Sequence, residues 1–176
     1  QTLRSLFSGQ LNATLMERAV QEYKKIQNAS IPHISALLKT GVPDWRLSRL
    51  PDLYDRFVRD EEALKKWSIG VDDRRKLQEQ KNFFSDLCSH IASYNIPDTL
   101  NHSDFQENNM VIDSVTGNVS IIDWGEVTIS HALWPVVGCF KKICWRYKIP
   151  QDSPAYHALL AHFMDGWDVR EQSIED

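Results

Sequence analysis

The stretch Asn101-His-Ser-Asp-Phe-Gln-Glu-Asn-Asn109 and the two short runs after it, Met110-Val-Ile-Asp113 and Val119-Ser-Ile-Ile-Asp123, decide the interpretation of this chain. Both runs are rich in β-prone residues. The loop Ser114-Val-Thr-Gly-Asn118 between them offers Gly and Asn for positive φ, so the pattern predicts a β-hairpin. A polar segment as dense as the one before it is typical of a functional loop rather than of a core.

A hairpin centred on Thr116 would place Asn109 directly opposite Asp123, and opposed residues lie about 4.5–5.5 Å apart. Its open end would then present an amide oxygen and a carboxylate together, with Asp104 a short loop away. Such hard oxygen ligands suit Mg²⁺, which keeps water and phosphate oxygens in the rest of its shell. A further carboxylate could accept a proton from a hydroxyl nucleophile. The spacing resembles the metal and base arrangement of protein kinases.

The motif resembles one family in particular. His102-Ser-Asp-Phe-Gln-Glu-Asn-Asn109 followed by Ile121-Ile-Asp-Trp-Gly-Glu126 is similar to the signature of the aminoglycoside phosphotransferase and choline kinase-like family. That signature is H-G-D-x-x-x-x-N, then a strand ending I-D-[WF]. The similarity covers roughly residues 10–170, although its specificity rests on the two motifs. The family's usual Gly is replaced here by Ser103.

The resemblance implies a role for each matched position. Asp104 would be the catalytic base, Asn109 and Asp123 the metal ligands, and His102 a structural member of the loop. The implied reaction is ATP-dependent transfer of a phosphoryl group to a hydroxyl of a small molecule, with ATP and Mg²⁺ as cofactors. No residue of the chain is assigned to binding of the nucleotide itself.

Most of the remaining sequence predicts helices. Apolar residues recur with helical periodicity over 14–27, 73–94, 135–147 and 154–167, so the expected fold is mainly α with a small β-hairpin. The resemblance implies the C-terminal lobe of a protein-kinase-like (aminoglycoside phosphotransferase) fold, with the N-terminal lobe absent.

That lobe is expected to span residues 1–176 as one domain. Within it, 1–100 is expected to be helical, 101–130 to hold the catalytic loop and the metal-binding hairpin, and 131–176 to be helical.

A Gly-rich phosphate loop and a strand lysine are the parts that the sequence does not match. The family carries them in an N-terminal lobe, which would precede Gln1. The absence of an initiator Met favours a fragment of a longer protein, so the missing lobe is an expected partner and the chain alone is expected to transfer little phosphate. The alternative is a catalytically inactive kinase-like binding or scaffold module. Retention of all three polar positions argues against it.

Composition excludes several other classes of protein. A net charge of −4 argues against a nucleic-acid or anionic-membrane partner, which would favour a basic face. No apolar run approaches the roughly 18 residues that span a bilayer. Three cysteines without CxxC spacing argue against a zinc site and indicate reduced thiols, as expected for a cytoplasmic protein.

A rival enzyme class uses some of the same residues. His102 and Asp104 with a distal His157 or His162 imitate the two-histidine, one-carboxylate triad of non-haem Fe(II) oxygenases, and Arg170 could bind a co-substrate carboxylate. That chemistry is usually housed in a many-stranded β-barrel, which a helical chain cannot build.

The acceptor molecule is not identified by the sequence, because fold analogy does not choose among small hydroxyl compounds. Asp165 and Asp168 are candidate walls for a cationic acceptor. Exposed acids at a helix end are the equally good alternative.

Overall fold

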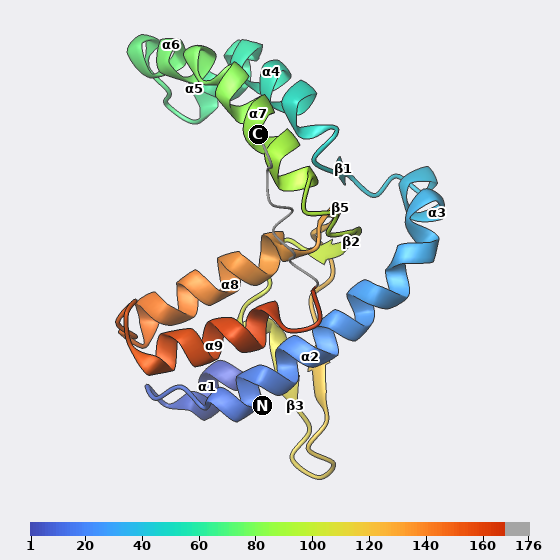
Figure 1. The fold of residues 1–176 in the computed structure, drawn as a ribbon, viewed down its shortest axis with the longest axis vertical. Helices are drawn as coiled ribbons and strands as arrows, with labels where there is room; N and C mark the ends of the chain where they lie inside the picture. Colours follow the sequence, from blue (N-terminus) through green and yellow to red (C-terminus); the bar gives the residue numbers. More distant parts are fainter. Residues whose placement is uncertain (168–176) are drawn as a thin grey trace, which may run out of the picture. The chain divides into compact units, whose positions relative to one another are not determined.

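The computed structural model describes residues 1–167 and divides them into two compact units (Figure 1). The first unit joins Gln1–Pro43 to Pro97–Trp167, and the second comprises Asp44–Ile96. Both consist mostly of helices with short strands, which confirms the expected mainly α composition. None of the helices in the described part of the chain is both long and apolar enough to cross a bilayer.

Seven helical segments belong to the first unit, one of them the short 3₁₀ turn η2 (Glu107–Asn109) in the polar loop. Helix α9 packs against both α8 and α2, and Figure 1 shows the three side by side. Their apolar stripes meet in one core with side chains of the polar loop and the hairpin. This core includes Met16, Tyr23, Phe105, Met110, Ile121, Val136, Phe140 and Phe163. The other six are α1 (Leu3–Phe7), α2 (Ala13–Ser30), the 3₁₀ turn η1 (Ile31–His33), α3 (Ile34–Lys39), α8 (Leu133–Arg146) and α9 (Pro154–Met164).

The predicted hairpin is present as β3 (Met110–Ile112) and β4 (Val119–Ile121). A second antiparallel pair, β2 (Asp98–His102) with β5 (Val127–His131), was not predicted. Strand β2 (Asp-Thr-Leu-Asn-His) has one apolar residue among its five, so it carries a weak strand signal. Because β2 runs directly into the polar loop, this pair sets where the loop begins.

The register of the hairpin differs from the prediction. Ile112 lies opposite Val119, so the centre precedes Thr116 and the expected pairing is wrong by one residue. The cause is the Asp113 carboxylate, which accepts the N–H groups of Val115 and Thr116 at 2.8 Å each. This side-chain cap ends the β3 ladder earlier than the Gly and Asn positions suggested.

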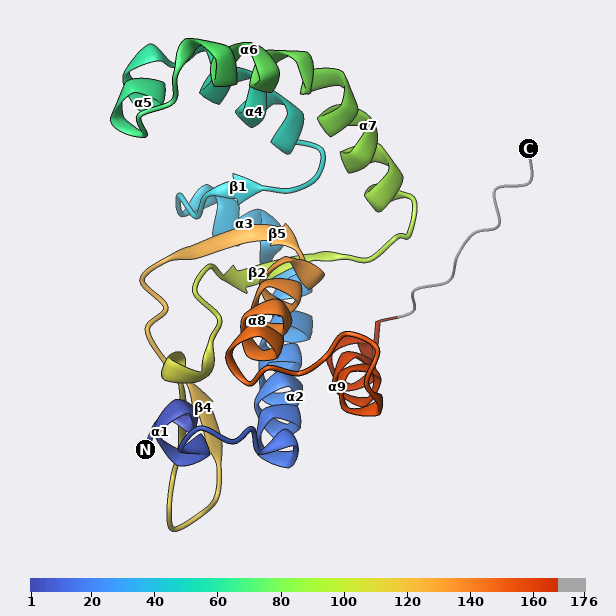
Figure 2. The same cartoon turned by 90° about the vertical axis from the view of Figure 1, so that its left-hand side faces the viewer.

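The second unit contains β1 (Asp44–Trp45) and four helices. The continuous helix predicted over 73–94 is interrupted at Gln80, which caps both α6 and α7. Packing on α4 accounts for the break: the rings of Tyr54 and Phe84 stack at 4.7 Å, and the Tyr54 hydroxyl donates to the carbonyl of Leu77. Figure 2 shows the chain turning between α6 and α7. The helices are α4 (Leu50–Arg59), α5 (Glu61–Lys66), α6 (Val71–Glu79) and α7 (Lys81–Ala92).

Candidate functional site

The polar loop that follows β2 is anchored by the buried imidazole of His102. Its Nδ1 accepts the N–H of Asp104 at 3.1 Å, and its Nε2 lies 2.9 Å from the carbonyl oxygen of Ile122. An acceptor at Nδ1 places the proton of the neutral ring on Nε2, which therefore donates to Ile122. The side chain thus joins the loop to the end of the hairpin, which supports the structural role expected for it.

Buried polar side chains of helix α2 form hydrogen bonds with the end of β2, where the same loop begins. The Tyr23 hydroxyl accepts the N–H of His102 at 2.8 Å and donates to Oδ1 of Asn101 at 3.2 Å. Gln27 donates to the same Asn101 oxygen at 2.7 Å. Burial raises the pKa of Tyr23 far above its usual value, so the hydroxyl stays protonated and able to donate. These bonds hold the end of β2 against the helix.

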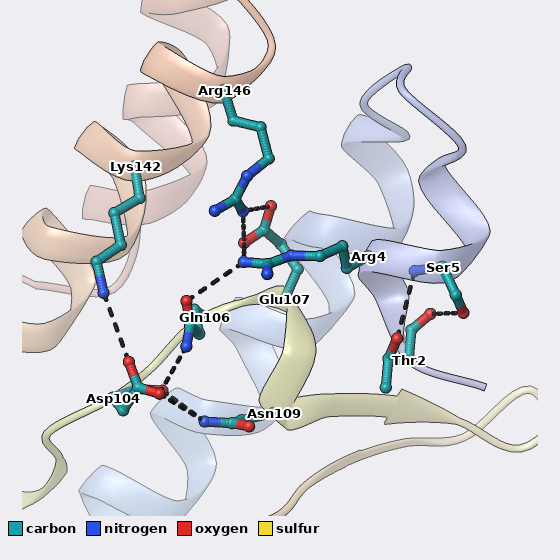
Figure 3. Close-up of polar contacts among 9 residues, drawn as sticks. All are labelled: Thr2, Arg4, Ser5, Asp104, Gln106, Glu107, Asn109, Lys142 and Arg146. Atoms are coloured by element: carbon teal, nitrogen blue, oxygen red, sulfur yellow. Dashed lines mark hydrogen bonds and ion pairs between the residues drawn. The ribbon is translucent and has the colours of Figure 1, made fainter.

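The two carboxylate oxygens of Asp104 have different surroundings (Figure 3). Oδ2 accepts hydrogen bonds from the side-chain amides of Gln106 at 2.6 Å and Asn109 at 3.1 Å. Oδ1 lies 3.5 Å from the ammonium group of Lys142 on α8. The oxygen of Gln106 accepts in turn from Arg4 of α1 at 3.3 Å. One oxygen is therefore held in place, while the other is left on a half-exposed side.

Asn109 and Asp123 lie at the same end of the hairpin, but they are not directly opposed. The N–H of Ile122 donates to the carbonyl of Asn109 at 2.9 Å, so Asp123 follows one position beyond that partner. It is exposed, and its φ of +65° turns the chain away from the strand. The predicted direct opposition of Asn109 and Asp123 is therefore wrong by the same single residue as the hairpin register.

The side chains of Asn109 and Asp123 carry the types of oxygen donor that a hard cation takes. Asn109 uses its amide nitrogen on the carbonyl oxygen of Asp104 at 2.9 Å and on that residue's Oδ2, which directs its own side-chain oxygen elsewhere. No group of three His, Cys, Asp or Glu side chains within residues 1–167 is arranged to hold a metal ion. An amide oxygen from Asn109 and a carboxylate from Asp123 would leave most of the shell to water and phosphate, as Mg²⁺ prefers.

Glu107 is a member of the loop for which the sequence suggested no role. Its side chain is 0% exposed, and Arg146 of α8 donates to both carboxylate oxygens at 2.6 Å, with Arg4 at 3.7 Å (Figure 3). Burial alone would raise the pKa of Glu107, but the bonds from Arg146 outweigh it and hold that pKa below its usual value. No local pattern signals this pair, because its partners lie 39 residues apart.

The residues of the rival oxygenase site are not brought together. Both ring nitrogens of His102 are engaged in the contacts described above. His162 pairs with Glu17 of α2 at 3.2 Å, and His157 packs edge-on against the ring of Tyr156. Arg170 lies outside the described residues. The geometry therefore offers no two-histidine, one-carboxylate set within residues 1–167.

Asp165 and Asp168 are the candidate residues for binding a cationic acceptor, and the surroundings of Asp165 differ from that expectation. The backbone carbonyl of Asp165 accepts a hydrogen bond from the ammonium group of Lys24, whose pKa is lowered by burial. A cation therefore already lies beside Asp165. Asp168 lies outside the described residues.

Comparison with known proteins gives one match. The model of a family described as the phosphotransferase enzyme family matches residues 8–172. A search of curated proteins and a search of solved structures each found no match. The matched segment contains the polar loop, the hairpin and helices α2, α8 and α9.

Proposed function

The chain belongs to the phosphotransferase enzyme family, and from that premise we propose that it carries the catalytic residues of an ATP-dependent kinase acting on a hydroxyl of a small molecule. Membership confirms the resemblance drawn from the motif His102–Asn109 and indicates transfer of a phosphoryl group. The nucleotide, the metal ion and the class of acceptor are our proposal.

One observation supports it most directly, namely the asymmetric surroundings of the Asp104 carboxylate. Amide donors from Gln106 and Asn109 fix Oδ2, so the carboxylate is held in one orientation before any substrate arrives. Oδ1 remains on the half-exposed side, where it could accept the proton of an acceptor hydroxyl. A positioned base of this kind typically accelerates a reaction by about 10²–10⁴-fold.

The proposed roles of Asn109 and Asp123 follow from their chemistry. Their side-chain oxygens would hold Mg²⁺, which supplies charge neutralisation for phosphate groups when it is bound. Phosphoryl transfer depends mainly on positioning and electrostatic stabilisation. Two oxygen ligands at the end of a short hairpin are therefore enough for the protein's share in holding the metal ion.

We place the Gly-rich loop and the strand lysine of the nucleotide site outside this chain, because no segment of residues 1–176 carries either pattern. The proposed active enzyme is therefore the natural protein that contains this chain together with such a lobe. The 176-residue chain alone is expected to transfer little or no phosphate.

The test uses that natural protein with ATP, Mg²⁺ and a panel of hydroxyl acceptors, following formation of ADP and of phosphorylated product. With the acceptor found, Asp104→Asn should lower kcat by at least about 10²-fold without unfolding the protein. Asp113→Asn is the matched control, since Asn can still cap the hairpin turn, and it should keep wild-type turnover.

Two results would count against the proposal. Normal turnover of the Asp104→Asn protein would remove the residue from the mechanism. A folded protein that phosphorylates none of the acceptors and does not consume ATP would favour the alternative, a catalytically inactive kinase-like binding module.

A further inference from the structure

A cation from a distant helix lies beside the proposed base. Lys142 projects from α8, and its Nζ lies 3.5 Å from Oδ1 of Asp104, across 38 residues of sequence (Figure 3). The other carboxylate oxygen is already occupied by two amide donors. The ammonium group therefore lies on the side of Asp104 at which a substrate hydroxyl would have to arrive.

The ion pair between Lys142 and Asp104 contributes too little free energy to stabilise the fold. Their side chains are 51% and 43% exposed, and exposed ion pairs of this kind contribute roughly 0–1 kcal/mol. The same helix supplies a different kind of pair one turn later, where Arg146 binds the fully buried Glu107 at 2.6 Å. The guanidinium group of Arg146 is held by that carboxylate. The ammonium group of Lys142 can leave Asp104 for another anion at a cost of little free energy.

We propose that Lys142 binds the phosphate group that is to be transferred at Asp104. A lysine ammonium is a compact point charge with three donors, suited to the oxygens of a phosphate. One N–H of the Lys142 ammonium group is directed to Asp104, which leaves two N–H donors for such a ligand. The transferring phosphoryl group spreads negative charge over three oxygens, so a cation here is worth most at that stage. Binding of the phosphate follows from the charge and position of Lys142, while its part in transfer rests on the proposed function.

The transfer step balances with the groups named. The acceptor hydroxyl oxygen forms its bond to phosphorus as the bond from phosphorus to the leaving diphosphate oxygen breaks. The hydroxyl proton passes to Oδ1 of Asp104. As Asp104 becomes neutral, Lys142 loses its carboxylate partner and is free to neutralise the phosphate oxygens.

Phosphate binding can be measured on the 176-residue chain without any turnover. Inorganic phosphate is titrated at pH 7 and low ionic strength, and binding is followed by changes in backbone amide NMR signals. Loss of a charged hydrogen bond costs about tenfold or more in affinity, so Lys142→Ala and Lys142→Gln should weaken binding by that amount. Lys142→Arg should keep affinity within roughly threefold, because it keeps the charge.

Lys141 provides the matched control. It is the neighbouring exposed lysine on the same helix, and it makes no ion pair within residues 1–167. Lys141→Ala removes the same net charge and should leave phosphate affinity unchanged. Asp104→Asn should strengthen binding, because it removes a negative charge beside the ligand.

Three results would overturn the inference: undetectable phosphate binding by the wild-type chain, wild-type affinity in Lys142→Ala, or equal weakening by Lys141→Ala. The two proposals fail separately. If phosphate binds through Lys142 but the natural protein phosphorylates no acceptor, the kinase assignment fails and the anion site stands. If Asp104→Asn abolishes turnover while Lys142→Ala leaves both turnover and phosphate affinity intact, only the role of Lys142 is wrong.

Discussion

The buried carboxylate of Glu107 accepts two hydrogen bonds of 2.6 Å from a single guanidinium nitrogen, Nη1 of Arg146. Because Arg146 lies in the last turn of α8, the pair fastens that helix to the loop that carries Asp104. Arg4 of α1 approaches the same carboxylate at 3.7 Å. The candidate site is thus fixed from two helices that are remote in sequence.

Removing the charge of Glu107 should destabilise the chain. Glu107→Gln leaves Arg146 without its partner, and breaking a buried pair from one side costs about 3–5 kcal/mol. Partial exposure of the arginine reduces this, so we expect a loss of about 2–3 kcal/mol in the free energy of unfolding, measured in urea at pH 7. Glu22→Gln breaks an exposed pair with Lys25 and should change the same quantity by less than about 0.5 kcal/mol.

Stability should also depend on pH through Glu107. The bonds from Arg146 hold its pKa below the ordinary value of a glutamate in the folded chain, so the stabilisation is fully present above that ordinary value. It is lost as the pH falls through the lower, folded-state pKa. The difference in unfolding free energy between wild type and Glu107→Gln should therefore shrink between pH 5 and pH 2, as urea titrations at several pH values would show. A constant difference would contradict the assignment.

Gln106 should act as a positioning residue for Asp104. Its amide donates to Oδ2 at 2.6 Å, and Arg4 holds its oxygen. In the active natural protein, Gln106→Ala should lower kcat by roughly tenfold with little change in KM, because orientation is lost and binding is not. Gln106→Glu should be worse, since it places a second carboxylate beside the first.

The neighbouring Asn108 offers the control for this comparison. Its side chain has no role in the contacts described, so Asn108→Ala should retain wild-type kcat. A loss of kcat in Gln106→Ala that is matched by Asn108→Ala would indicate general damage to the loop rather than loss of positioning.

Tyr23 should contribute to stability through its hydroxyl. Tyr23→Phe leaves the N–H of His102 buried without its acceptor, which costs about 1–3 kcal/mol in unfolding free energy. Tyr94→Phe removes an exposed hydroxyl and should cost less than about 0.5 kcal/mol. Equal effects in denaturant unfolding would show that the buried network does not carry this energy.

Two glycines should respond to Ala in opposite directions. Gly117 in the hairpin turn has a φ of +70°, so Gly117→Ala should destabilise by about 1–2 kcal/mol. Gly138 lies within α8 with open space at its Cβ position, so Gly138→Ala should stabilise by about 0.5–1 kcal/mol. Thermal unfolding of both variants measures the two signs, and equal signs would contradict the explanation.

Local patterns predicted the hairpin and most helices of the chain, because each depends on residues within a few positions of one another. The helix predicted over 154–167 is observed as α9, which begins at Pro154 as expected. The register failed by one residue because the Asp113 cap competes with the turn signals of Gly117 and Asn118. The prediction of one continuous helix over 73–94 failed because the interruption at Gln80 depends on packing against α4.

By itself, the sequence determined membership of the phosphotransferase family and the resemblance of Asp104, Asn109 and Asp123 to its motif, since that spacing is encoded in one short segment. Only the tertiary structure decided what surrounds them: Lys142 lies 38 residues from Asp104, Arg146 lies 39 from Glu107, and Tyr23 lies 79 from His102. The physical reason is that burial of apolar helix faces chooses these partners, and the periodicity of a helix shows which side is buried but not which polar group it will meet.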